Sequence, residues 1–440
     1  MADTLVIGGG AVGTAIAYEL ARKGAEVTLV ERGPDLCAEC SYGNAGLICP
    51  SHAAPLPSPL ALRQGIRWAL KRDSPLYLKP RPAVAPWLIR FLAACTEGRA
   101  RRGTELIRSL SLRSLELHAE LAEELDTGLE RRGVLNAYET ETGFDRGQKE
   151  VAASREAGMR VESLPIAEAR QLEPSLAPSL AGAIYYPDEA HCEPNRFVHA
   201  LGEGAAALGV RIRTDVEVIG FRRGNGRVTS VETTAGEEPV GEVVIAAGSW
   251  TKELAAALGL FVPIEGGKGY HVEIDPPVDG PEIPVFMQES RVIATPLPDR
   301  VRLAGTLELA GLDMSIDHVR VAAIVRAAER NVPSLGARRV RAVWRGLRPC
   351  APDGLPIVGR PEKYENVVLA TGHAMMGITL APITGRLVAE LIAGEEPAVD
   401  PAPLSPNRFH SFLPRRPARE PAPTAGPAPV ESEPPGHPGP

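Results

Sequence analysis

The sequence predicts an α/β protein in which a Rossmann-type domain of discontinuous segments carries a second domain, built on a mixed or antiparallel sheet with cap helices. Three observations predict this fold. A strand, a glycine-rich turn and a helix begin the chain. A second strand, glycine turn and helix end its globular part, and the region between them is rich in alternating, strand-like patterns.

The first unit has the order strand, turn, helix, strand. A short apolar run at 5–7 precedes the glycines, residues 15–23 are helix formers, and 27–30 form a second apolar strand. This βαβ order at the start of a chain is typical of a dinucleotide-binding domain.

The glycine spacing in this unit has a physical reading. Gly8 permits a tight turn, Gly10 lets a pyrophosphate approach the backbone, and Gly13 lets helix and strand pack closely. The helix N-terminus supplies amide donors to the phosphates. Glu31, at the end of the second strand, is placed to accept hydrogen bonds from ribose hydroxyls.

The remaining elements follow in order. Helices are expected over 60–132, and beyond Gly133 the chain becomes β-rich. Asn225-Gly226 predicts a hairpin turn. Expected helices are 195–208, 319–329 and 379–392; expected strands are 210–214, 216–223, 228–233, 243–247, 269–274, 292–295 and 301–305.

These elements predict a division into domains. The nucleotide-binding domain is expected to comprise 1–59, 150–250 and 340–400, and the substrate and cap domain 60–149 and 251–339. The proline-rich end, 410–440, has almost no apolar periodicity and is expected to be a disordered tail.

Composition excludes several classes of protein. Acidic residues outnumber basic ones by 55 to 48, a net charge of −7, which argues against a nucleic-acid partner. Six cysteines in 440 residues do not make a disulfide scaffold. The uncharged stretch 4–18 is too short to span a membrane and has no basic region before it. We therefore expect a cytoplasmic protein.

Several stretches along the chain form one recognisable set. They are the N-terminal unit, Ser41-Tyr42-Gly43-Asn44-Ala45-Gly46, residues 244–250, Gly346-Leu347-Arg348-Pro349 through Gly354, Gly372-His373, 380–382 and 404–409. Together they resemble the D-amino-acid-oxidase-like flavoproteins, and among them the bacterial D-amino-acid dehydrogenase branch. The resemblance covers residues 1 to about 409 and leaves the tail outside.

The resemblance implies FAD bound in an extended, noncovalent form. In the sarcosine-oxidase branch a cysteine tethers the flavin, and Gly346 stands at that position here. The implied cofactor-binding residues are Gly8, Gly10, Ala11, Val12, Gly13, Glu31, Arg32, Ser41, Asn44, Ala45, Gly46, Val216, Gly248, Gly372, Met375, Gly377, Ile378 and Thr379.

Two residues are implied to act on the substrate. Arg348 is the expected carboxylate anchor, because a guanidinium can bind a carboxylate through two hydrogen bonds. The alternative is a structural arginine paired with an acid such as Asp353. Tyr270 is expected to hydrogen-bond the same carboxylate, with core packing as its alternative. Met375 replaces a second arginine of the glycine-oxidase branch, which favours larger apolar substrates.

The implied reaction is oxidation of the Cα–N bond of a D-amino acid, with hydride transfer to flavin and hydrolysis of the imine to a 2-oxo acid and ammonia. Orientation would supply most of the catalysis. An oxidase that uses O2, a cyclic imino-acid (hydroxyproline-type) dehydrogenase, and an FAD-binding subunit that only relays electrons remain alternatives. An NAD dehydrogenase would explain the glycine turn but not the other stretches of the resemblance.

Two further features have more than one reading. Cys37 and Cys40 have the spacing of a redox or metal pair, but they lie in a loop and are expected to be ordinary thiols. Residues 60–72 place Arg63, Arg67 and Lys71 on one helix face, with Trp87 and Phe91 beyond. This segment is either a solvated cap or a face for peripheral membrane contact. The dehydrogenase branch that the whole chain resembles delivers electrons to membrane quinone. The resemblance therefore makes a quinone the expected electron acceptor.

Overall fold

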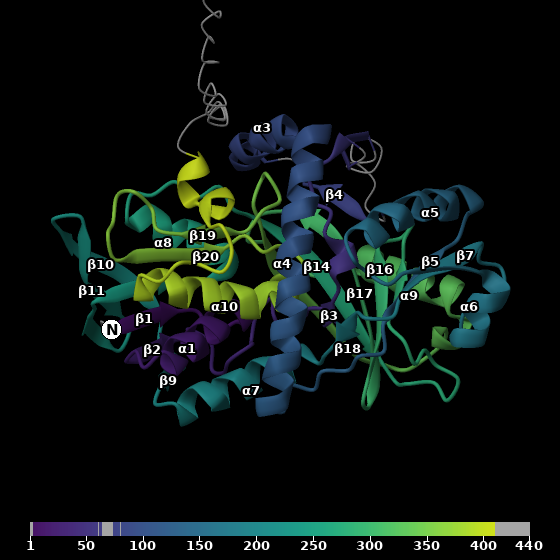
Figure 1. Cartoon of the computed structure of the whole chain (residues 1–440), viewed down its shortest axis with the longest axis horizontal. Coiled ribbons are helices and arrows are strands. Elements are labelled where there is room, and N and C mark those ends of the chain that lie inside the picture. Colours follow the sequence, from purple (N-terminus) through teal and green to yellow (C-terminus); the bar gives the residue numbers. More distant parts are fainter. Residues whose placement is uncertain (1–2, 60, 64–73, 80, 410–440) are drawn as a thin grey trace, which may run out of the picture.

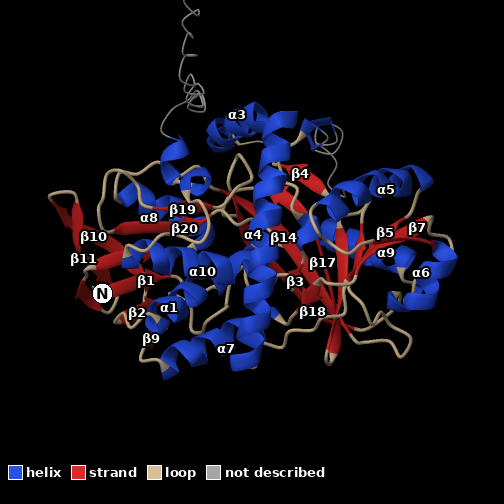
Figure 2. Ribbon diagram, in the orientation of Figure 1, coloured by secondary structure: helices blue, strands red, loops and turns tan. Residues whose placement is uncertain are grey.

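A computed structural model of the chain describes residues 3–59, 61–63, 74–79 and 81–409. The predicted tail at 410–440, and most of the predicted basic helix including Arg67 and Lys71, lie outside the described residues. Within the described residues the strands gather into two main groups, seen on the left and right of Figure 2.

The first group is the predicted Rossmann-type sheet, which has six strands in the described part of the chain, in the order β19-β20-β13-β1-β2-β9. All neighbours pair in parallel except β19 and β20. The strands are β1 (Thr4–Ile7), β2 (Val27–Val30), β9 (Arg211–Arg213), β13 (Glu242–Ile245), β19 (Ile357–Gly359) and β20 (Val367–Thr371).

Alternation along each strand gives this sheet two apolar faces. Val6 faces a core formed with the helices α1 (Ala11–Arg22), α7 (Pro194–Ala207) and α10 (Gly377–Ala393). Leu5 and Ile7 face a second core. That core is completed by α8 (Thr251–Ala257) and a small sheet of β10 (Val218–Gly224), β11 (Arg227–Thr233) and β12 (Gly236–Pro239). The hairpin at Asn225-Gly226 is confirmed, with positive φ at both residues.

The second group is a mixed sheet of nine strands within the described residues, ordered β18-β14-β17-β16-β15-β5-β7-β6, with β4 beside β17. Helix α9 (His318–Asn331) covers one face. The strands are β4 (Leu76–Leu78), β5 (Val134–Tyr138), β6 (Glu162–Pro165), β7 (Gly182–Tyr186), β14 (Glu265–Ile274), β15 (Val285–Met287), β16 (Val292–Leu297), β17 (Arg300–Leu309) and β18 (Val340–Cys350).

Helices and short strands connect the two groups. The long helix α4 (Glu97–Glu124) crosses the molecule between them in Figure 1 and packs its leucines into the core around α10. Other elements of the described residues are α3 (Ala85–Ala94), α5 (Glu141–Glu156), α6 (Ile166–Leu172), and the short pair β3 (Leu47–Ile48) and β8 (Ala190–His191).

The fold class agrees with the prediction, but two of the expected domain boundaries need correction. Strands β6 and β7 fall within 150–250, yet they pair with each other and with β5 in the second sheet. Strand β18 falls within 340–400, yet it pairs along its length with β14. These pairings join residues distant in sequence, so local patterns did not indicate which sheet each strand would enter.

Candidate active site

The turn after β1 has the close packing that its glycines allow. Gly8 has φ +112°, and a Cβ on it would lie 2.6 Å from the Ala246 carbonyl oxygen. A Cβ on Gly13 would lie 1.9 Å from the Gly8 carbonyl oxygen. Both positions therefore require glycine, and the result brings the α1 N-terminus against the end of β1.

Glu31 follows β2 and is fixed by the backbone. Its carboxylate accepts hydrogen bonds from the Gly9 amide at 2.7 Å and the Gly33 amide at 2.8 Å. A carboxylate oxygen has more than one acceptor position, so this arrangement leaves Glu31 able to accept from a further hydroxyl.

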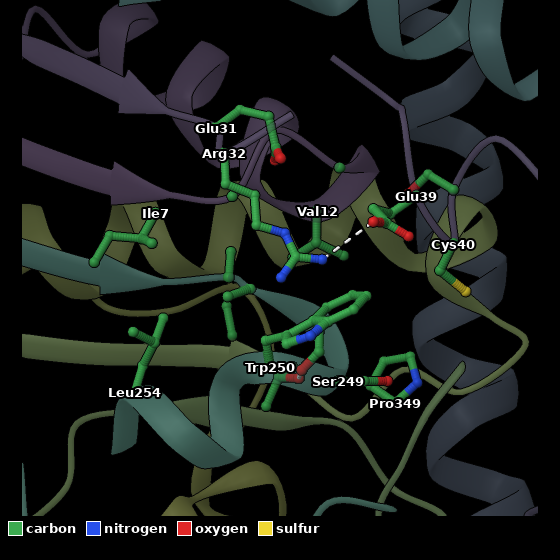
Figure 3. Close-up of a pocket in the computed structure, with 18 of the residues that line it drawn as sticks. Ile7, Val12, Glu31, Arg32, Glu39, Cys40, Ser249, Trp250, Leu254 and Pro349 are labelled. Atoms are coloured by element: carbon green, nitrogen blue, oxygen red, sulfur yellow. Dashed lines mark hydrogen bonds and ion pairs between the residues drawn. The ribbon is translucent and has the colours of Figure 1, made fainter. Parts of the chain in front are cut away.

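Arg32 extends across the cavity beside this turn, as Figure 3 shows. Its guanidinium carbon lies 3.8 Å from the centre of the Trp250 ring, and its Nη2 donates to Glu39 at 3.1 Å. Trp250 and Glu39 were not singled out from the sequence as cofactor residues. Their role here is to hold Arg32 over the cavity.

The cavity itself has a volume of about 470 Å³ and is lined by segments from both ends of the chain. Of the residues predicted to bind a cofactor, those that line it are Gly8, Gly10, Ala11, Val12, Glu31, Arg32, Ser41, Asn44, Val216, Gly248, Gly377 and Ile378. The other predicted residues, Gly13, Ala45, Gly46, Gly372, Met375 and Thr379, are not part of its lining. These six residues belong to the same stretches as the residues that line the cavity.

Hydrogen bonds join the loop at 41–46 to the turn before α10. The Asn44 side chain donates to the Met375 carbonyl at 3.1 Å and accepts from the Gly46 amide at 2.8 Å. Thr379 Oγ1 donates to the Leu47 carbonyl at 2.9 Å. The two stretches therefore form one wall of the cavity although more than 300 residues separate them in sequence.

This cavity has the features that an extended dinucleotide such as FAD requires. Glycines that exclude a Cβ let the backbone approach a pyrophosphate, and the N-termini of α1 and α10 present amide groups to negative charge. The Glu31 carboxylate can accept hydrogen bonds from the ribose hydroxyls. The described residues thus fit FAD.

Arg348 lies on β18 beside this cavity and is half-buried. Its guanidinium extends over Gly269, where a Cβ would lie only 2.1 Å from Nη1. Nη1 donates to the Thr306 carbonyl at 2.7 Å. Among the residues that the structure describes, no carboxylate lies within 4.0 Å of it, because Asp353 binds Arg408 instead. Burial lowers the pKa of Arg348, so a bound carboxylate would stabilise its charge.

Tyr270 needs correction as a substrate ligand. It lies opposite Arg345 on β18, whereas Arg348 lies opposite Gly267, so the two side chains point to opposite faces of the sheet. The Tyr270 hydroxyl donates to Glu308 at 2.9 Å inside the core beneath α9. The structure therefore favours the core-packing alternative for this tyrosine.

An aromatic residue that the sequence analysis missed lies at the edge of the site. The Trp344 indole stacks on His271, with ring centres 5.2 Å apart. A Cβ on Gly43 or on Gly346 would lie 1.7 or 1.9 Å from it. The two glycines were the only available sign that a bulky ring would lie between them.

The two cysteines of the Cys-x-x-Cys motif are separate thiols. Cys37 is buried and its thiol lies against the Pro194 carbonyl, while Cys40 lines the cavity. Burial raises the pKa of Cys40 to about 11, with Arg348 acting in the opposite direction. Both are therefore protonated near neutral pH.

Comparison with known proteins supports the interpretation of this site. A family model described as "FAD dependent oxidoreductase" (DAO) matches residues 3–391. The chain is 36% identical over 416 residues to a D-amino acid dehydrogenase of Methylobacterium nodulans, covering 92% of this chain and 98% of that protein. It is 35% identical to a D-amino acid dehydrogenase of Paramagnetospirillum magneticum, covering 93% and 99%.

Solved structures agree on the fold. The crystal structure of glycine oxidase from Geobacillus kaustophilus matches with a TM-score of 0.77 at 28% identity, covering 92% of this chain and 98% of that one. L-proline dehydrogenase from P. horikoshii matches with a TM-score of 0.74 at 21% identity, covering 93% and 97%, and supports the fold alone.

Proposed function

We propose that this chain, which belongs to the DAO family of FAD-dependent oxidoreductases, is a dehydrogenase that oxidises D-amino acids to 2-oxo acids and ammonia. The observation that carries the proposal is Arg348, a half-buried cation beside the cofactor cavity with no carboxylate within 4.0 Å among the described residues. The names of the relatives at 36% and 35% identity support the choice of substrate.

The residues around Arg348 suit an α-amino acid. The guanidinium is held by the Thr306 carbonyl through Nη1, which leaves its other nitrogens to bind a carboxylate. Gly269 has no side chain, so the guanidinium lies directly over its backbone, and the Trp344 indole fills the space beside Gly346. When bound, FAD supplies the acceptor for the hydride that leaves Cα. The oxidised imino acid is then hydrolysed by water to the 2-oxo acid and ammonia.

The residues named at this site include no strong general base. Burial lowers the pKa of His373 to about 4, and its Nε2 is hydrogen-bonded to Thr384. Cys40 stays protonated. The substrate amine must therefore arrive neutral, and we expect the rate of flavin reduction at subsaturating substrate to rise with pH up to the amine pKa.

Anaerobic bleaching of the bound flavin by a panel of D- and L-amino acids and glycine tests this function. We expect D-isomers with apolar side chains to bleach it fastest, since Met375 adds no charge to the site. Bleaching by L-isomers alone would contradict the proposed stereochemistry. If no amino acid bleaches the flavin although dithionite does, the chain is an electron-relay subunit rather than a dehydrogenase.

An oxidase that uses O2 is the second candidate, favoured by the match to glycine oxidase from Geobacillus kaustophilus. We propose quinone as the acceptor instead. Reoxidation of the reduced protein by a soluble quinone is then expected to be much faster than by air. Fast air reoxidation with stoichiometric peroxide would assign the chain to the oxidases.

We further propose that the chain contacts the inner face of the cell membrane through α3. Ile89 and Leu92 on this helix are 51% and 46% exposed. Arg90 lies over the Phe261 ring, which is itself 48% exposed. This mixture of exposed apolar side chains and an arginine suits an anionic lipid surface. Among the described residues no helix has both the length and the apolar run needed to cross a bilayer.

Most of the docking face predicted from the sequence, including Arg67 and Lys71, lies outside the described residues. Trp87 and Phe91 are buried, stack at 5.0 Å, and Trp87 donates to the Cys350 carbonyl. The test therefore uses Ile89→Gln with Leu92→Gln. We expect this pair to abolish co-sedimentation with anionic vesicles, while Leu172→Gln, exposed on α6, leaves it unchanged. Unchanged binding by the double variant would place the docking face elsewhere.

A further inference from the structure

Four consecutive carbonyl groups of the loop at 41–46 face side chains of the second sheet. Arg302 on β17 donates from Nη1 to Tyr42 and Asn44, each at 2.8 Å. His271 on β14 is 3.4 Å from the Gly43 carbonyl through Nδ1, and Thr295 on β16 donates to Ala45 at 2.8 Å. These three side chains have 0% exposure. The loop that lines the cofactor cavity is thus held from behind by three strands of the substrate domain.

Burying the Arg302 side chain behind this loop is energetically unfavourable by itself. A fully buried guanidinium loses its hydration, which costs several kcal/mol unless charges and hydrogen bonds compensate. Glu273 on β14 provides the charge, accepting from Nη2 at 2.7 Å and from Nε at 3.1 Å. Burial raises the pKa of Glu273, but Arg302 and Arg300 outweigh it and hold that pKa below its usual value. Glu273 is therefore ionised, and Nη1 of Arg302 donates both of its hydrogen bonds to the loop.

The two carbonyls that Arg302 binds determine where the next amides point. In a trans peptide the C=O and N–H groups point in opposite directions. The peptides after Tyr42 and Asn44 therefore direct the N–H groups of Gly43 and Ala45 away from Arg302. In the described part of the chain, neither N–H has a hydrogen-bond partner, and Asn44, which lies between the two residues, lines the cofactor cavity.

We propose that Arg302, fixed by Glu273, is a positioning residue that presents the Gly43 and Ala45 amides as hydrogen-bond donors to the flavin ring of bound FAD. Donors at the ring stabilise the negative charge that it gains on reduction, so they raise its reduction potential. The inference deepens the proposed function, since it concerns the same site.

Strand β17 also links this loop to the substrate anchor. Four residues after Arg302, Thr306 has φ +59°, a conformation that a β-branched residue rarely adopts, and its carbonyl accepts from Arg348. Strand β17 therefore hydrogen-bonds both to the loop proposed to contact the cofactor and to the guanidinium proposed to bind the substrate carboxylate. This fixes the two partners of hydride transfer relative to each other.

The test compares Arg302→Lys, and the double variant Arg302→Met with Glu273→Gln, with the wild type. The double variant leaves no unpaired buried charge, and the lysine variant preserves the charge if the double variant does not fold. Arg320→Lys is the matched control, because Arg320 is also 0% exposed and donates to the Ser74 and Leu307 carbonyls away from the loop. Each protein is assayed for FAD dissociation, melting temperature and flavin midpoint potential by dithionite titration.

We expect Arg302→Lys and the double variant to bind FAD at least tenfold more weakly. We also expect the reduced form to lose at least tenfold more affinity than the oxidised form, which lowers the two-electron potential by about 30 mV. Arg320→Lys is expected to lower the melting temperature without moving the potential. A potential within experimental error of the wild type in folded Arg302 variants, or an equal shift in Arg320→Lys, would overturn the proposal. Since dithionite replaces the substrate, this result is independent of whether D-amino acids bleach the flavin.

Discussion

Asp353 accepts hydrogen bonds from Arg408, from Nε at 2.7 Å and from Nη2 at 3.2 Å. The pairing joins the turn after β18 to the closing segment of the described chain. Asp353 was the acid that would have made Arg348 a structural residue. Because Arg408 binds it, the charge of Arg348 remains available to a ligand.

The first prediction concerns this anchor. Arg348→Lys keeps the charge but cannot bind a carboxylate through two parallel hydrogen bonds, so we expect KM to rise and flavin reduction to slow. The loss in kcat/KM is expected to be roughly 10- to 100-fold, corresponding to about 1.4–2.7 kcal/mol. Flavin content should not change. Arg345→Lys is the control, since Arg345 points to the other face and donates to Met314. Unchanged reduction in Arg348→Lys would reject the anchor.

The second prediction concerns the attachment of FAD. Position 346 holds glycine, and the Trp344 indole occupies the space beside it. We therefore expect acid precipitation of the purified protein to release all of its flavin into the supernatant. Flavin absorbance retained in the washed pellet would show a covalent bond and refute this assignment.

The third prediction concerns the first glycine turn. Gly13→Ala places a methyl group 1.9 Å from the Gly8 carbonyl oxygen, so helix and strand must separate. We expect a loss of about 2 kcal/mol or more in the free energy of unfolding, together with weaker FAD binding. Gly98→Ala on α4, with 3.6 Å to the nearest side chain, should be neutral or slightly stabilising. Thermal melting and FAD titration of both variants measure the difference.

The fourth prediction concerns the pH dependence of stability. Glu189 is 3% exposed, accepts from the Ser51 amide and hydroxyl, and has its pKa raised to about 8 by burial. The folded state keeps this proton up to about pH 8, whereas the unfolded chain releases it near 4.5. This contribution to stability is therefore present at low pH and lost as pH rises from about 4.5 to about 8.

Glu189→Gln removes that titration while keeping an acceptor for Ser51. We expect its Tm to match that of the wild type near pH 4.5 and to exceed it by roughly 5 °C at pH 8. Glu203→Gln, exposed on α7, should follow the wild type at every pH. A difference between Glu189→Gln and the wild type that does not change with pH would show that Glu189 is already ionised in the folded state.

Local sequence was sufficient to predict an element wherever a few neighbouring residues determine its backbone conformation. The turn between β1 and α1, the turn at Gly372 after β20 and the Asn225-Gly226 hairpin each contain a residue with positive φ, a backbone conformation that few residue types adopt. Of the predicted cofactor residues in the first two of these stretches, the ones that line the cavity are Gly8, Gly10, Ala11, Val12, Gly377 and Ile378.

The sequence by itself determined the family and the glycine turn after β1, and it predicted Arg348 as the carboxylate anchor, because each depends on residues that are close together in the chain. Only the tertiary structure decided that Tyr270 faces the core, that β6, β7 and β18 enter the second sheet, and that Arg302 holds the cofactor loop. Each of these outcomes depends on which strands pair and in which register. Since a shift of one residue turns a side chain to the opposite face, contacts between residues as distant as 42 and 302 are settled only when the sheet forms.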